Sequence, residues 1–298
     1  MLPELLFYFL AVATPEQRAV DFLAREVPRW SGENHCFSCH NNGDGARALF
    51  AARKAGYTVP DASLADTIDW LRHPERWDEI HGSPAASDKK LARIQFSAAL
   101  AQACRTGQIR DREPLPRAAN SLLKLQEPDG AWLVDTGGLP GAPATYGAVL
   151  ATYLARQTLE TAASPQYAEA IARANRWLAA IEPANLLDTA ALLLALPRSE
   201  TIRRRCLPVL VNAQTSDGGW GPQPHAPAEA FDTAVAMLAL RAASESAPLA
   251  RARGFLLKTQ DQSGAWPETT RPGGGSSYAE EISTAAWVTL ALLDSGGN

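Results

Sequence analysis

Three segments of the chain repeat the pattern Q-x3-G-x-W, and this repeat constrains the fold more than any other feature of the sequence. The copies begin at Gln126, Gln214 and Gln260, so their spacings are 88 and 46 residues. Because 88 is twice 44, a degenerate copy is expected between the first two, and the segment from Trp177 to Glu182 stands there. A period of this length is typical of chains built from stacked structural units.

A second set of positions follows the same period. Alanine- and leucine-rich segments begin at threonines that are 44, 44 and 51 residues apart: Thr145, Thr189, Thr233 and Thr284. Each unit is therefore interpreted as a helix that ends near the glutamine, a glycine-containing turn, and a second helix capped by Asp, Ser or Thr. Two upstream units fit this rhythm, with helices over about 15–27 and after 44, then over about 61–72 and 88–105. The sequence predicts six helical hairpins.

The three Q-x3-G-x-W copies, the last preceded by the residues Arg253 to Leu256, resemble the repeats of squalene-hopene cyclases, oxidosqualene cyclases and the related prenyltransferases. Residues from about 110 to 298 resemble these repeats in their motifs, whereas the first third of the chain resembles them only in the spacing of its expected helices. It implies an all-α fold, an (α/α)6 toroid of six hairpins with an inner and an outer ring. Residues 14–298 are expected to form this toroid as a single domain.

The resemblance does not extend to the chemistry of squalene-hopene cyclases. That family builds its acid from a D-x-D-D-T-A motif, whose central aspartate gives the proton. The corresponding residues 229–234 read E-A-F-D-T-A, which places Phe231 at the position of the donor. A phenyl ring cannot donate a proton, so terpenoid or prenyl processing is disfavoured and a role other than catalysis is expected.

Charge and the amino-terminal residues bear on partners and compartment. The formal net charge of −4 provides no basic field for nucleic acid. Residues 5–12 form an apolar run that is followed by small residues up to Ala13, which predicts a signal peptide over 1–13 and a periplasmic or otherwise exported protein. A first helical turn that packs on the domain is the alternative. No other segment is long and apolar enough to span a membrane, so no membrane span is expected in the mature chain.

The sequence C-x-x-C-H, formed by Cys36, Cys39 and His40, is the attachment signature of a c-type haem. Two thiols three positions apart can add to the two vinyl groups of one porphyrin. The adjacent His40 is then held beneath the iron as its proximal ligand. We therefore expect haem c bound covalently to Cys36 and Cys39, in the connection of the first hairpin and so on a rim of the toroid.

This placement suggests partners for the haem, because connections of consecutive hairpins share a rim. The second connection contains His73 and His81. His81 is the expected distal iron ligand and His73 the alternative, since Pro74 pins His73 at a helix end. If the ring closes, Arg271 in the sixth connection is the candidate partner of a haem propionate.

The function expected from these observations is that of an exported haem protein in electron transfer, or of a haem-bearing accessory to a redox enzyme, with an unidentified redox partner. One alternative is a binding toroid that holds a hydrophobic small molecule in its cavity and a structural zinc at the Cys-His cluster. A redox-active dithiol and a purely structural pair of thiols also remain open.

Overall fold

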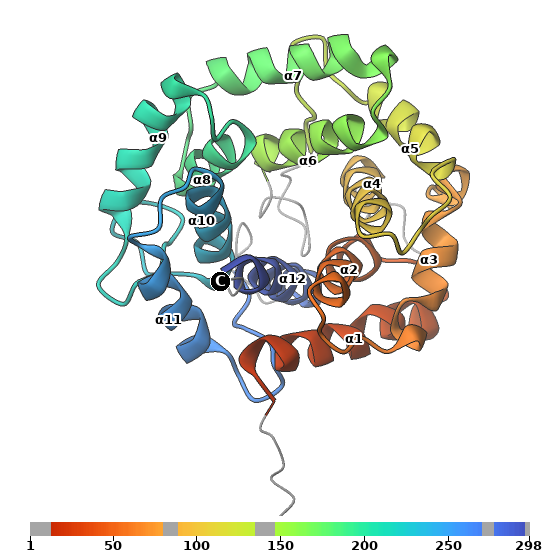
Figure 1. The fold of residues 1–298 in the computed structure, drawn as a ribbon, viewed down its shortest axis with the longest axis horizontal. Helices are drawn as coiled ribbons and strands as arrows, with labels where there is room; N and C mark the ends of the chain where they lie inside the picture. The colour runs from red at the N-terminus through yellow and green to blue at the C-terminus, as the bar shows by residue number, and fades with distance from the viewer. Residues whose placement is uncertain (1–12, 80–88, 135–146, 270–276, 296–298) are drawn as a thin grey trace, which may run out of the picture.

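The computed structural model describes residues 13–79, 89–134, 147–269 and 277–295. Within these residues, helices alternate between an outer and an inner ring, which confirms the expected all-α toroid (Figure 1). The outer ring consists of α1 (Pro15–Asn34), α3 (Ala65–Leu71), α5 (Pro114–Leu123), α7 (Ala168–Ala180), α9 (Glu200–Ala213) and α11 (Leu249–Thr259). The inner ring consists of α2 (Ala46–Lys54), α4 (Lys89–Arg105), α6 (Gly147–Ala162), α8 (Leu186–Ala195), α10 (Ala230–Ala242) and α12 (Tyr278–Ser295).

Short helical turns complete the hairpins. They are η2 (Asp61–Ser63), η3 (Pro74–Arg76) and η6 (Pro165–Tyr167), together with the π-helical segment η1 (Cys39–Gly45), which runs directly into α2. The inner helix α2 begins after Asp44, as the repeat spacing predicted, and the π-helical turn η1, which was not predicted, precedes it. The chain between α1 and η1 is correspondingly short.

The glutamines of the repeat hold each outer helix to the next. The side-chain nitrogen of Gln126 donates to the carbonyl of Gly130 in its own turn at 3.1 Å and to that of Ala170 in α7 at 2.8 Å. The indole nitrogen of Trp132 donates to the carbonyl of Leu122 in the preceding outer helix. The other two copies make the same glutamine bonds, from Gln214 to Gly218 and Pro248 and from Gln260 to Gly264 and Pro15.

The last copy closes the ring, because its partner helix is α1. Gln260 donates to the carbonyl of Pro15 at 2.8 Å. Gly264 has a φ of +98°, and a Cβ there would lie 2.2 Å from the carbonyl oxygen of Arg18, so neither the backbone conformation nor the space admits a side chain. Sequence segments from opposite ends of the chain thus lie side by side, as Figure 1 shows for α1, α11 and α12.

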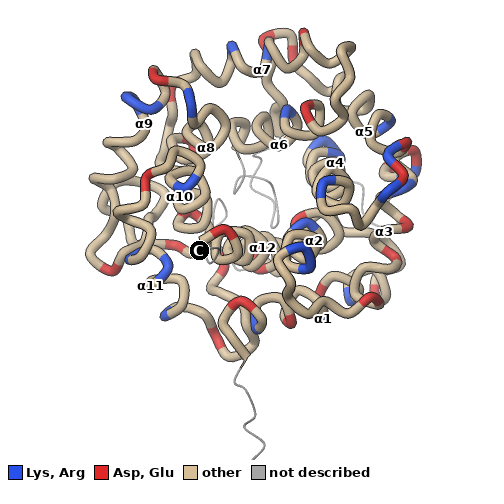
Figure 2. Tube along the Cα trace, in the orientation of Figure 1, with Lys and Arg blue, Asp and Glu red and all other residues tan. Residues whose placement is uncertain are grey.

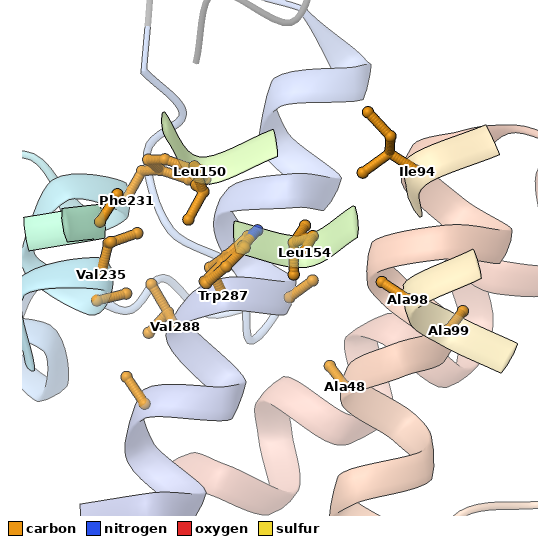
Figure 3. Close-up of a cluster of buried hydrophobic side chains, with 14 of the residues drawn as sticks. Ala48, Ile94, Ala98, Ala99, Leu150, Leu154, Phe231, Val235, Trp287 and Val288 are labelled. Carbon is orange, nitrogen blue, oxygen red and sulfur yellow. The ribbon is translucent and has the colours of Figure 1, made fainter. Parts of the chain in front are cut away.

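The core lies between the two rings and at the inner faces of the inner helices. Apolar side chains from α2, α4, α6, α10 and α12 approach one another around Trp287 (Figure 3). Burial of this kind contributes roughly 25 cal/mol per Å² of apolar surface, so this layer stabilises the ring as a unit. Among the described helices, none has the length and apolar composition that crossing a bilayer requires.

Candidate functional site

The segment η1 is an unusual element, because it brings polar residues into the inner ring. Ser38 caps it by accepting from the amides of His40 and Asn41. A Cβ on Gly43 would lie 2.8 Å from the Cβ of Gln95, and one on Gly45 would lie 2.9 Å from a methyl of Val27. These glycines therefore permit close packing of η1 against α4 and α1, which buries the residues between them. π-helical turns of this kind occur frequently at functional sites.

A chain of hydrogen bonds crosses from η1 to α12 and α4. The Nδ1 atom of His40 lies 2.7 Å from the hydroxyl oxygen of Ser283. That hydroxyl donates to Oδ2 of Asp44 at 2.9 Å, and the side-chain nitrogen of Gln95 donates to the same oxygen at 2.8 Å. All four side chains are buried, Asp44 completely. The sequence places these residues far apart, whereas the closed ring brings them together.

The geometry fixes the tautomer of His40. A serine hydroxyl has one proton, and Ser283 uses it to donate to Asp44. The short contact between Ser283 and His40 must therefore have Nδ1–H as its donor. In the neutral imidazole, this leaves Nε2 as the basic nitrogen. His40 is thus held through Nδ1 by Ser283, which in turn donates to Asp44.

One turn beyond Asp44, Arg47 lies at the inner face of α2. Its guanidinium carbon lies 4.2 Å from the centre of the Trp287 ring, a cation–π contact, and Nη2 lies 3.7 Å from Oδ1 of Asp44. Arg47 is only 5% exposed, yet its Nε and Nη2 atoms donate no hydrogen bond. Figure 3 shows Trp287 within the cluster of buried apolar side chains, near Leu154 and Val288. Arg47 thus contacts both this apolar cluster, through Trp287, and the polar cluster, through Asp44.

Hydrogen bonds on both sides keep η1 in place. The side-chain nitrogen Nδ2 of Asn41 donates to the backbone carbonyl of Glu26 and to the hydroxyl of Tyr278, each at 2.8 Å. Tyr278 donates to the carboxylate of Glu26 at 2.7 Å and stacks on Trp30. Burial, followed by this bond to Glu26, raises the pKa of the Tyr278 hydroxyl, so it stays protonated. These contacts tie η1 to α1 and α12.

The two thiols of the C-x-x-C-H motif lie at the entry to η1. Cys36 and Cys39 are half-buried and form no disulfide. Phe37, between them, stacks on Trp70 of α3 with ring centres 4.4 Å apart. His40 is not on an exposed rim, as the sequence had suggested, because its ring is turned into the wall between η1 and α12.

The other expected haem ligands do not join His40 in the described structure. His73 lies at the end of α3, where its partly exposed ring contacts Glu75 and Asp69. His81 and Arg271 lie outside the described residues. Over the described part of the chain, no group of three or more His, Cys, Asp and Glu side chains is arranged to hold a metal ion, which gives no support to zinc at the Cys-His cluster. Attachment of haem to Cys36 and Cys39 stays a prediction.

The position of the cyclase acid is apolar, as the sequence predicted. Phe231 is fully buried in α10 and packs edge to face on Trp287, with ring centres 6.0 Å apart. Asp188, in the neighbouring inner helix α8, accepts from the amide of Ala184, while burial raises the pKa of its carboxyl. Asp44, in η1, is a buried carboxylate that accepts from Ser283 and Gln95 and lies 3.7 Å from Arg47.

Comparison with known proteins establishes the fold. No family model matches the chain, and no curated protein matches its sequence. The apo type II terpene cyclase MstE from Scytonema is similar over 94% of this chain and 98% of that chain, with a TM-score of 0.58 and 14% identity. ent-Copalyl diphosphate synthase from Streptomyces platensis matches 84% of this chain and 50% of its own length, with a TM-score of 0.57 and 20% identity. A glycosidase in complex with glucose is similar over 96% of this chain and 99% of that chain, with a TM-score of 0.60 and 12% identity.

These neighbours correct the function expected from the C-x-x-C-H motif. A haem protein in electron transfer, with a zinc-bearing scaffold as its alternative, is contradicted, because the matching toroids include terpene cyclases and no finding indicates haem or electron transfer, whereas export stays a prediction. The physical reason is that His40, which was expected to bind iron at a rim, is hydrogen-bonded within the inner wall. The neighbours are named as enzymes, which also weakens the expectation of a role other than catalysis.

Sequence reasoning missed most of the site. Asp44, Gln95, Arg47 and Ser283 were not singled out, and Trp287 was regarded only as part of a helix. A signal was nevertheless present, because the small and polar run from 41 to 45, N-N-G-D-G, is unlike the alanine- and leucine-rich starts of the other inner helices.

Proposed function

We propose that this protein binds an isoprenoid ligand at the centre of its ring and transfers a proton on that ligand through His40. The observation that carries the proposal is the chain from His40 through Ser283 to Asp44 in the wall of an otherwise apolar ring. It orients one imidazole, which is what a general base requires.

The types of side chain on the inner helices support an isoprenoid as the ligand. The buried cluster between the inner helices consists of branched aliphatic and aromatic side chains, such as Leu150, Val235 and Trp287 (Figure 3). Side chains of these kinds suit a branched hydrocarbon, and an indole face attracts positive charge. The comparisons add support from fold likeness, since a variant of the terpene cyclase MstE has been solved with geranylgeranyl dihydroxybenzoate as substrate. Fold likeness alone does not assign an activity.

The absence of a proton donor at Phe231 shapes the chemistry that we propose. Protonation of an isolated alkene needs a far stronger acid than an imidazolium ion, whose unperturbed pKa is about 6.5. A histidine base is instead suited to a hydroxyl or phenol, from which it removes the O–H proton to leave an alkoxide or phenolate beside the imidazolium ion. We therefore expect a ligand that joins an isoprenoid chain to such a group.

The experiment incubates prenylated phenols with the purified full chain in D₂O and measures conversion, by mass spectrometry, as deuterium that replaces hydrogen at the ring carbons beside the phenol oxygen. We expect conversion by the native protein and a loss of about 100-fold or more in His40→Gln, in line with the usual contribution of a general base. His225→Asn is the matched control, because His225 is exposed and asparagine tolerates its positive φ of 69°. Absence of conversion by the native protein, or equal conversion by His40→Gln, would contradict the proposal.

A further inference from the structure

The guanidinium of Arg47 carries hydrogen-bond donors that are buried without an acceptor, which is unfavourable in free energy. Its Nε and Nη2 atoms are buried and donate no hydrogen bond. Asp44 is the nearby carboxylate, but at 3.7 Å it forms an ion pair without a hydrogen bond, and its Oδ2 already accepts from Gln95 and Ser283. Buried charged groups are ordinarily both paired and hydrogen-bonded, so Arg47 is prepared for a further partner.

A shallow cavity, open to solvent, lies at the C-terminal ends of α4 and α6. This cavity has a volume of about 490 Å³ and is lined by Arg105, Arg112, Gln157, Glu160 and Thr161. Gln157 donates to the hydroxyl of Tyr153 at 3.0 Å. Burial raises the pKa of Tyr153, and the nearby guanidiniums of Arg47, Arg105 and Arg156 act to lower it, so Tyr153 is close to Arg47 and also to Arg105, which lines the cavity.

The charges around this cavity are mostly positive. Arg105 and Arg112 line the cavity, and the carboxylate of Glu160, which also lines it, lies 3.7 Å from Arg156. Figure 2 shows Lys and Arg positions on the neighbouring inner helices α2 and α4. A cationic entrance raises the local concentration of anions and favours their approach.

We propose that Arg47 binds the oxyanion head group, a carboxylate or a phosphate, of the isoprenoid ligand, with Arg105 and Arg112 attracting it at the entrance. This inference rests on the proposed function and specifies its substrate class. A planar guanidinium donates two parallel hydrogen bonds to such a group. Trp287, stacked beneath Arg47, keeps the guanidinium plane in position and meets the first carbons of the chain.

The test is calorimetric binding of three ligands with the same chain, namely farnesol, farnesoic acid and farnesyl phosphate, to the full-length protein. We expect the two anions to bind at least about tenfold more tightly than farnesol, as charge-assisted hydrogen bonds predict. Arg47→Gln is expected to remove the preference for the two anions over farnesol, whereas Arg47→Lys retains part of it. Arg204→Gln is the control, since Arg204 is exposed on α9 and pairs with Glu200.

The outcomes separate the two proposals. If farnesol binds but neither anion binds more tightly, the head-group inference is overturned and the proposed function stands. If Arg47→Gln weakens all three ligands equally, Arg47 has a packing role only and the inference is overturned. If no ligand binds the native protein, both proposals are overturned. The comparison of ligands on the native protein decides the inference even if Arg47→Gln fails to fold, and a stronger response to phosphate or to carboxylate identifies which oxyanion the site takes.

Discussion

At the scale of single residues, the site depends on one hydroxyl. Ser283 joins His40 to Asp44, and it comes from the last inner helix whereas they come from the first. The sequence identified His40 as a functional residue, through its place after Cys39. It could not identify its partners, because no short-range pattern connects residues that are 243 positions apart.

The tautomer of His40 is a prediction at this scale. We expect Nδ1 to carry the proton in the neutral ring, because the hydroxyl of Ser283 donates to Asp44. Nitrogen chemical shifts of His40 in ¹⁵N-labelled protein measure this directly. Ser283→Ala removes the acceptor of Nδ1–H and should shift the ring toward the commoner Nε2–H form. A native protein with the proton on Nε2 would contradict the proposed orientation of the base.

At the scale of elements, the repeat made it possible to predict the helical hairpins. It gave no indication that the first hairpin differs from the others. The predicted turns recur because the Q-x3-G-x-W copies attach one outer helix to the next in each unit. The predicted Asp, Ser or Thr caps are wrong for α8, which Asn185 caps, and for α10, where Glu229 at the N-cap makes no side-chain hydrogen bond. The first unit lacks that pattern. Its connection was therefore assigned to a rim, whereas Ser38 caps a π-helical start that turns His40 inward.

Two glycines near the last outer helix should respond in opposite ways to alanine. Gly264→Ala places a Cβ 2.2 Å from the carbonyl oxygen of Arg18 at a φ of +98°, and we expect a loss of about 2 to 4 kcal/mol in the free energy of unfolding. Gly254 lies inside α11, where an added methyl would meet no atom within 4 Å, so Gly254→Ala should add up to about 1 kcal/mol. Urea unfolding measures both values. Similar effects of the two substitutions would show that the tight turn is not needed.

At the scale of the whole molecule, the ring is held closed by contacts between its first and last units. Besides Gln260, the carboxylate of buried Glu16 in α1 accepts from Arg253 in α11. The composition and length of the chain were compatible with one domain or two. The repeat predicted a single ring. Closure of that ring was expected only because six hairpins complete a toroid.

The ion pair between Glu16 and Arg253 predicts a pH dependence of stability. Burial raises the pKa of Glu16, but the hydrogen bond and charge of Arg253 outweigh it, and the pKa lies below its ordinary value of 4.5. The pair therefore stabilises the fold above the unfolded-state pKa, and this contribution is lost as the pH falls through the lower folded-state value. Glu16→Gln should lower the free energy of unfolding by about 1 kcal/mol at pH 7 and by less at pH 3.5. The value at pH 7 is small because Arg253 is 31% exposed and solvent screens the pair.

Urea unfolding at the two pH values measures this difference. Glu33→Gln is the control, because Glu33 pairs with Arg29 within one turn of the same helix and both side chains are exposed. A cost of Glu16→Gln that is independent of pH would contradict the role of this ion pair in closing the ring.

The central claim is that the ring takes an isoprenoid at its centre, and photoaffinity labelling tests it most directly. A farnesyl derivative with a diazirine on its chain is photolysed with the full-length protein, and the labelled peptides are located by mass spectrometry. We predict labels on the inner helices, foremost near Trp287 in α12 and Arg47 in α2, that unlabelled farnesyl ligand prevents. Labels confined to the outer helices, or labels at the centre that no competitor reduces, would contradict the account.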